Sequence, residues 1–195
     1  RGLVWTGTAV LVLAAAIGIS QLTVLNSLKA LFFETIALRL DDKSLNRDFG
    51  GTATFYVYFE GKETDSLKDP LILKGIEGLQ HELETLPEVG KTQSFVDYLK
   101  AVNQSLHEGD PSYRVVPDSR SAVGEYLFLF SISGNQGEMD RLVDYEYKRA
   151  VVWVYLKDDS TVLGQKLVAL VRDYAHEHLP GASIRGEWNA TTVGN

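Results

Sequence analysis

The sequence contains no cysteine among its 195 residues. That absence excludes a disulfide framework, catalysis by a thiol and a zinc site built on thiolates. It also argues against a eukaryotic extracellular domain, since such domains are usually rich in disulfides. We therefore read the glycosylation sequons that begin at Asn103 and Asn189 as chance matches.

Basic residues are also scarce, because 19 Lys and Arg stand against 26 Asp and Glu, for a formal net charge of −7. An acidic chain without a cluster of Lys and Arg is a poor candidate for binding nucleic acid or anionic lipid head groups. We therefore expect no nucleic-acid partner.

Charged residues are missing altogether from Gly2 to Leu28, and Ala9–Ile19 is an unbroken apolar run. A helix of about 20 apolar residues crosses a hydrocarbon core roughly 30 Å thick, and backbone groups in lipid must bond within that helix. The stretch predicts a helix that spans the membrane once. Two alternatives stay open: a signal peptide cleaved near Gly18-Ile19-Ser20, and a buried helix of a soluble domain.

Three segments follow from this pattern. We expect a transmembrane helix at 1–28, a juxtamembrane helical linker at 29–48 and a globular domain at 49–195, which is long enough for one hydrophobic core. The chain begins at Arg1 rather than Met, as expected of a fragment or a processed product.

Apolar periodicity predicts the elements of the domain. Alternation over 54–59 is typical of a strand, and spacings of three and four from Leu73 to Leu86 are typical of a helix that begins at Asp69-Pro70. The remaining predictions are strands at 89–93, 150–156 and 183–188 and helices at 95–107, 119–131 and 160–179.

Some finer features are also predicted. Ser94-x-x-Asp97 is typical of a capping box, Asp118 should cap the helix that follows it, and 133–137 should be a loop. The strand at 150–156 is apolar on both faces, as in the centre of a sheet. We expect its Trp153 to pack between the helices at 70–86 and 160–179, against Ile76 or Leu170.

The order of elements is β-α-β, two inserted helices, then β-α-β, which is typical of a split β-α-β sandwich. The predicted fold class is therefore α+β: an N-terminal transmembrane helix followed by a ferredoxin-like α/β sandwich with inserted helices.

Residue types that carry chemistry are present without the spacing that chemistry needs. His176 and His178 lie two apart on a predicted helix and point to different faces, and His81-Glu82 lacks the second His of a zinc-protease helix. Asp41-Asp42 and Asp158-Asp159 are typical of turns and caps. We predict no catalytic, cofactor or metal site, and no enzyme.

Tyr126, Phe128 and Phe130 are the candidate binding residues. On a helix each residue turns by about 100°, so these three cannot all face one core. Some of this aromatic area should line a cleft or a subunit contact. The alternative, in which all of it packs under the loop at 133–137, stays open.

Several motifs occur in a familiar order. These are Asn26-x-Leu28, Phe33-x(5)-Arg39, Asp48-Phe49-Gly50-Gly51-Thr52, Leu86-Pro87-Glu88-Val89-Gly90, Ser94-x-x-Asp97-x-Leu99 and Leu142-Val143-Asp144-x-x-Tyr147. With one membrane helix, a linker and a split sandwich, the whole chain resembles an extracytoplasmic loop of the RND (resistance–nodulation–division) superfamily, in particular of its MMPL-like and hopanoid-transporter-like lipid exporters. It departs from that family at 34–38, where a proline is often found and none is present.

The resemblance implies one transporter half's first transmembrane helix and its periplasmic porter domain, from a proton-driven exporter of the bacterial inner membrane. The implied partners are the lipid bilayer, the remaining transmembrane helices, a second porter domain and a hydrophobic or lipid-like substrate, whose path Tyr126, Phe128 and Phe130 would line. The family's proton-relay acids lie in later helices, so this chain could bind or dock but not pump. The alternative is a membrane-anchored periplasmic binding or assembly module without transport activity.

Overall fold

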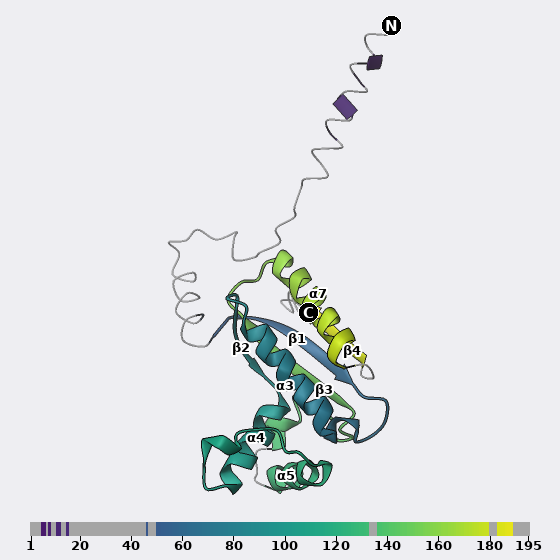
Figure 1. Cartoon of the computed structure of the whole chain (residues 1–195). Coiled ribbons are helices and arrows are strands. Elements are labelled where there is room, and N and C mark those ends of the chain that lie inside the picture. The colour runs from purple at the N-terminus through teal and green to yellow at the C-terminus, as the bar shows by residue number, and fades with distance from the viewer. Residues whose placement is uncertain are drawn as a thin grey trace.

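A four-stranded antiparallel sheet forms the centre of the protein (Figure 1). The computed structural model describes residues 50–132, 136–179 and 183–188, with 5–6, 8, 11–12, 15 and 46. The strands are β1 (Ala53–Glu60), β2 (Val89–Gln93), β3 (Arg149–Leu156) and β4 (Ser183–Trp188), and their order in the sheet is β2-β3-β1-β4. The register pairs Tyr56 of β1 with Trp153 of β3.

Two long helices, α3 (Pro70–Glu84) and α7 (Thr161–His178), lie on the same face of the sheet (Figure 1). Both predicted β-α-β units are present, as β1-α3-β2 and β3-α7-β4. We call the sheet with these two helices the body. Between β2 and β3 the chain forms α4 (Phe95–Leu106), the short helix η3 (Pro111–Tyr113), α5 (Arg120–Ile132) and α6 (Gln136–Met139), which we call the inserted lobe. A further short helix, η2 (Ser66–Lys68), precedes α3.

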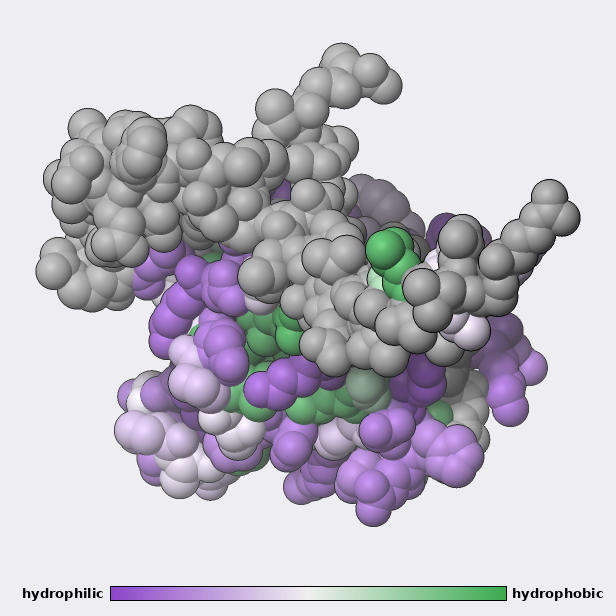
Figure 2. All heavy atoms as spheres, turned by 90° about the horizontal axis from the view of Figure 1, so that it is seen from above, coloured by the Kyte–Doolittle hydropathy of each residue, from purple (hydrophilic) through white to green (hydrophobic). Residues whose placement is uncertain are grey.

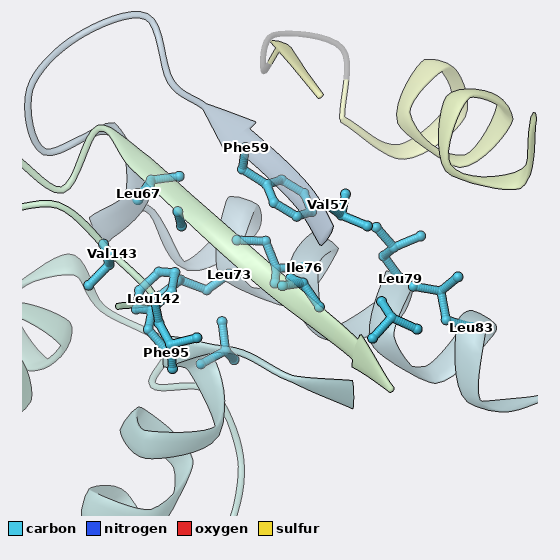
Figure 3. Close-up of a cluster of buried hydrophobic side chains, with 14 of the residues drawn as sticks. Val57, Phe59, Leu67, Leu73, Ile76, Leu79, Leu83, Phe95, Leu142 and Val143 are labelled. Carbon is cyan, nitrogen blue, oxygen red and sulfur yellow. The ribbon is translucent and has the colours of Figure 1, made fainter. Parts of the chain in front are cut away.

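The core follows from the alternation that the sequence shows. Phe55, Val57 and Phe59 of β1 are buried on the side of the helices, where they meet the apolar stripe of α3. That stripe consists of Leu73, Ile76, Leu79 and Leu83, all fully buried (Figure 3). Phe95, Leu142 and Val143 continue the same cluster, so one core holds the body and the lobe together.

Local end signals place the helices where the sequence predicts them. The Asp69 carboxylate accepts a hydrogen bond from the Leu71 N–H at 2.8 Å, and Pro70 opens α3. The capping box at Ser94 and Asp97 is confirmed, with the Asp97 carboxylate accepting from the Ser94 N–H at 2.9 Å. These contacts satisfy backbone donors that a helix start would otherwise leave unpaired.

Glycines close one end of the sheet. A Cβ on Gly90 would lie 1.4 Å from the carbonyl oxygen of Gly50, and a Cβ on Gly51 would lie 2.5 Å from that of Leu156. Gly51 also has φ +147°, a conformation that residues with side chains rarely adopt. Two of the motifs that carry the family resemblance therefore meet here to hold backbone against backbone.

The predicted fold class is wrong in its first element. Among the described residues no helix is both long and apolar enough to cross a membrane. The longest described helix, α7, has 18 residues and carries charges such as Lys166, Arg172 and Asp173. Most of 1–28 and nearly all of the linker at 29–48 lie outside the described residues. The fold class is therefore corrected to an α+β domain with an antiparallel four-stranded sheet.

The predicted position of Trp153 is also wrong. Its neighbours Val152 and Val154 are buried toward the helices, and successive side chains of a strand point to opposite faces. Trp153 therefore faces away from α3 and α7, where its ring meets that of Tyr56 edge to face at 5.6 Å between centroids. The apolar run of β3 did not reveal which of its two faces the helices cover.

Two local predictions in the lobe need correction. Ser119, not Asp118, caps α5, because its hydroxyl accepts from the Ala122 N–H at 3.1 Å. Asp118 instead forms an ion pair with Lys74 of α3 at 2.7 Å. The predicted loop at 133–137 includes the start of α6, while 133–135 lie outside the described residues.

Candidate functional site

Helix α5 positions the predicted binding residues. Val123 and Leu127 are buried and anchor one face of this helix to the core. The opposite face therefore stands on the surface of the lobe, since residues of a helix alternate between faces with a period of 3.6.

The structure separates the three predicted path residues. The Tyr126 hydroxyl donates to Oδ1 of Asn103 at 3.1 Å, and the Phe130 ring meets the Tyr98 ring edge to face at 5.1 Å. Both side chains thus tie α5 to α4. Phe128 alone is turned outward and is 64% exposed. The prediction that the three do not share one core is confirmed, and the alternative in which all of them pack under 133–137 is wrong for Phe128.

Phe128 belongs to an exposed apolar group that we call the outer ridge. Its members are Phe128, Leu129 and Ile132, which are 64%, 38% and 64% exposed. Phe128 and Ile132 lie four residues apart and so are neighbours on the helix surface. Sequence reasoning missed Ile132, although that spacing of four from Phe128 was the signal that could have found it.

A small hollow, which we call the notch, lies beside the outer ridge. Its lining comes from α5 and from the segment before β3, and comprises Leu127, Phe130, Ser131, Met139, Asp140, Val143, Asp144, Tyr145 and Tyr147. Ser131 joins the two features, because its hydroxyl donates to the carbonyl oxygen of Phe128 at 2.7 Å. The open space in the notch is about 20 Å³, enough for a group of about the size of water.

The rim of the notch is acidic and tyrosine-rich. Asp144 is engaged: its carboxylate accepts from the N–H groups of Lys148 at 2.8 Å and Arg149 at 3.0 Å, and from the Arg149 guanidinium at 3.1 Å. Partial burial acts to raise the pKa of Asp144, but these hydrogen bonds outweigh it, so the pKa lies below its ordinary value. Asp140 is exposed.

The pKa of Tyr147 reflects the negative electrostatic potential around the notch. Burial raises the pKa of its phenol, and the negative charges of Asp65 and Asp140 raise it further. Lys68 Nζ lies 4.4 Å from the centre of the Tyr147 ring, so an ammonium group already packs on an aromatic face here. Neither Asp140 nor Tyr145 was predicted, and no periodicity in the sequence singles them out.

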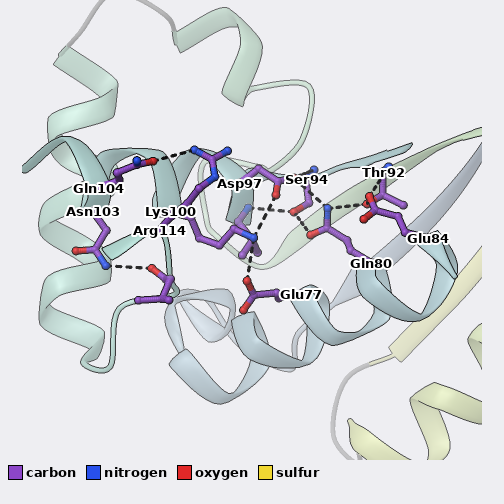
Figure 4. Close-up of polar contacts among 12 residues, drawn as sticks. Glu77, Gln80, Glu84, Thr92, Ser94, Asp97, Lys100, Asn103, Gln104 and Arg114 are labelled. Atoms are coloured by element: carbon purple, nitrogen blue, oxygen red, sulfur yellow. Dashed lines mark hydrogen bonds and ion pairs between the residues drawn. The ribbon is translucent and has the colours of Figure 1, made fainter. Parts of the chain in front are cut away.

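A second, polar hollow of about 370 Å³ lies between α3, β2 and α4. Figure 4 shows the polar side chains of this region and their contacts. Buried Gln80 donates to Thr92 Oγ1 and to Asp97 Oδ2, both at 3.0 Å, and accepts from the buried Ser94 hydroxyl at 2.7 Å. Lys100 bridges the two helices through Glu77 at 2.8 Å. Because the buried groups satisfy one another, this network serves to join α3 to β2 and α4.

Metal-binding and modification candidates are limited. Across the described ranges no three His, Asp or Glu side chains are placed to hold a metal ion. His176 and His178 are both exposed, and the His178 ring stacks on Tyr174 at 4.4 Å. The Asn103 side chain is buried and donates to the Val115 carbonyl at 3.0 Å, so its sequon is closed in the folded protein. Asn189 lies outside the described residues.

From above, the described surface is mostly hydrophilic, with hydrophobic residues visible in smaller areas (Figure 2). The outer ridge is an exposed apolar feature of the lobe. Neither a protein-family model nor a curated protein matches this chain.

Proposed function

We propose that this chain is a non-catalytic binding domain of an RND-type exporter, acting in the periplasm, and that the outer ridge contacts the hydrophobic or lipid-like substrate. The ordered motifs of the sequence support the exporter class. The single observation that supports the apolar ligand is the exposure of Phe128 and Ile132, 64% each, on neighbouring positions of α5.

The physical argument is one of area. Single exposed apolar side chains are ordinary on protein surfaces, whereas large contiguous apolar patches mark sites that bind other molecules. A hydrocarbon chain laid on the ridge gains about 25 cal/mol for each Å² of apolar surface removed from water. The three side chains of the ridge form far less than the roughly 800 Å² per partner that a stable protein interface buries. The ridge therefore suits a chain-like ligand better than a folded partner.

A labelled chain provides the test. Because the sequence lacks cysteine, a Ser121→Cys variant of the full chain can carry one environment-sensitive fluorophore. Ser121 is exposed, and it lies seven residues before Phe128 on the same face of α5. We expect decanol to change the fluorescence, and Phe128→Ala to weaken that binding at least tenfold, since burying a ring contributes about 1.5–3 kcal/mol.

The matched control is Leu71→Ala, which removes another exposed apolar side chain, 77% accessible, from α3 in the body. This variant should bind decanol as the unsubstituted protein does, including any binding by the N-terminal apolar run. Equal loss in both variants, or no binding at all, would contradict the proposal.

A transport assay distinguishes the exporter domain from the binding or assembly module without transport activity. In cells that carry the parent exporter, Phe128→Ala should lower export of a hydrophobic substrate at unchanged protein level. Lost binding with unchanged export would instead favour the binding or assembly module without transport activity.

A further inference from the structure

The notch places a negative charge beside the outer ridge. Asp140 lines it, and within the described part of the chain no hydrogen bond or ion pair engages its carboxylate. Asp144, on the same rim, is already neutralised by Arg149. The open charge at this site is thus that of Asp140, in a chain whose net charge is −7.

Two of the nearby cations, Lys68 and Arg149, have partners of their own. Lys68 pairs with Asp65 at 2.7 Å, and Arg149 pairs with Asp144 at 3.1 Å. Arg141, the residue after Asp140, is exposed. These pairs leave the carboxylate of Asp140 able to attract a further cation.

An aromatic ring completes the rim. Tyr145 is 77% exposed and lines the notch. Tyr147, two residues further on, already has the Lys68 ammonium at 4.4 Å from its ring centre. The same interaction is therefore open to a ligand at Tyr145, because an ammonium is attracted to the face of a tyrosine ring.

A small head group suits the notch. Its open space of about 20 Å³ admits a group of about the size of water, such as a primary ammonium. The notch floor, made by Leu127, Phe130, Met139 and Val143, is apolar and continues toward the outer ridge through Ser131.

Resting on the function proposed above, we propose that the notch and the outer ridge together bind a cationic amphiphile with a primary ammonium head group. The ammonium lies between the Asp140 carboxylate and the Tyr145 ring. The hydrocarbon chain follows Phe128 and Ile132.

The test compares three ligands that share one chain: decylammonium, decanol and decanoate. Each is titrated into the full chain labelled at Ser121→Cys, below its aggregation concentration. We expect decylammonium to bind about threefold to thirtyfold more tightly than decanol, the range that an exposed ion pair and an exposed cation–π contact give together. Decanoate should bind most weakly, and added salt should reduce the difference.

Asp140→Asn should lower the affinity for decylammonium toward that of decanol, leaving only the contribution of the Tyr145 ring, and should leave decanol binding unchanged. Asp173→Asn is the matched control, since Asp173 is also an exposed acid, on α7 in the body. Tyr145→Leu keeps an apolar side chain and should lower only the affinity for decylammonium.

The outcomes distinguish the two proposals. If decanol binds through Phe128 but decylammonium binds no better, the cationic head group is wrong and the apolar site stands. If Asp140→Asn and Asp173→Asn weaken decylammonium equally, general attraction to an acidic protein is the cause and the notch site is overturned. If no ligand changes the fluorescence, both proposals fail.

Discussion

The body and the inserted lobe share one buried core, but the lobe also carries the adjacent exposed apolar side chains of the outer ridge. In the body, Phe55, Val57 and Phe59 are removed from water against α3. In the lobe, Phe128 and Ile132 of α5 remain on the surface. The buried side chains stabilise the fold, whereas the exposed ones remain available for binding. An apolar side chain that is already in the core has no further surface that a ligand could remove from water.

The two regions also differ in what holds them. Backbone approaches backbone in the body, at Gly50 and Gly90. The lobe shares buried apolar residues such as Phe95 with the core of the body, but its helices contact the body less extensively than the strands contact one another. Some of the joining contacts are polar, such as Lys74 to Asp118 at 2.7 Å. We expect the lobe to open more readily than the body, since fewer buried contacts resist it.

The strongest test of the comparison makes one substitution in both regions. Phe59→Ala should lower the free energy of unfolding by about 3–5 kcal/mol, because it empties a fully packed site. Phe128→Ala should change it by less than about 0.5 kcal/mol, as for other exposed residues. Urea unfolding followed by circular dichroism measures both. Equal effects would mean that Phe128 is a core residue.

Two glycine substitutions, one in the body and one in the lobe, should have effects of intermediate size on the free energy of unfolding. Gly90→Ala should lower the free energy of unfolding by about 2–4 kcal/mol, because the new methyl group meets the Gly50 carbonyl. Gly124→Ala in α5 should raise it by up to about 1 kcal/mol, since a Cβ there meets nothing within 4 Å and alanine favours a helix. Thermal unfolding of the two variants provides the comparison, and a stable Gly90→Ala protein would show that the sheet end is loosely packed.

The smallest expected effect on stability comes from Asp144, at the junction of body and lobe, and it depends on pH. Partial burial of Asp144 acts to raise its pKa, but the N–H groups of Arg149 and Lys148 and the Arg149 guanidinium lower it more, so the folded pKa lies below 3.8. A depressed folded pKa stabilises the protein above the unfolded value, and that stability is lost as pH falls through the folded value.

Asp144→Asn should therefore flatten the loss of stability below about pH 4, measured as urea midpoints across the acid range. Asp118→Asn is the control, because Asp118 is more exposed and its pair with Lys74 is screened by water. A steeper acid limb in the Asp144→Asn protein would contradict the lowered pKa.

Many helix starts, in the body and in the lobe, were predictable because their signals are local. Asp69-Pro70 and Ser94-x-x-Asp97 start helices through contacts within a few residues, and the structure confirms both. The substrate-path prediction was only partly informative. Helical geometry showed that Phe128 diverges from Tyr126 and Phe130, but the partners Asn103 and Tyr98 that hold those two inward come from another helix.

The transmembrane prediction had a different weakness. It rested on hydropathy and length over 1–28, and no described helix bears it out. Hydropathy reports how a segment partitions between water and lipid, not where the segment lies in a folded chain.

By itself, the sequence determined where most strands and helices of the domain begin and end, because capping, alternation and helical spacing act over a few residues. Only the tertiary structure decided that Trp153 faces away from the helices. It alone placed Asp140 and Tyr145 beside Ser131 and set Gly90 against Gly50. These placements depend on strand register and on packing between segments far apart in the chain, which a local pattern does not encode.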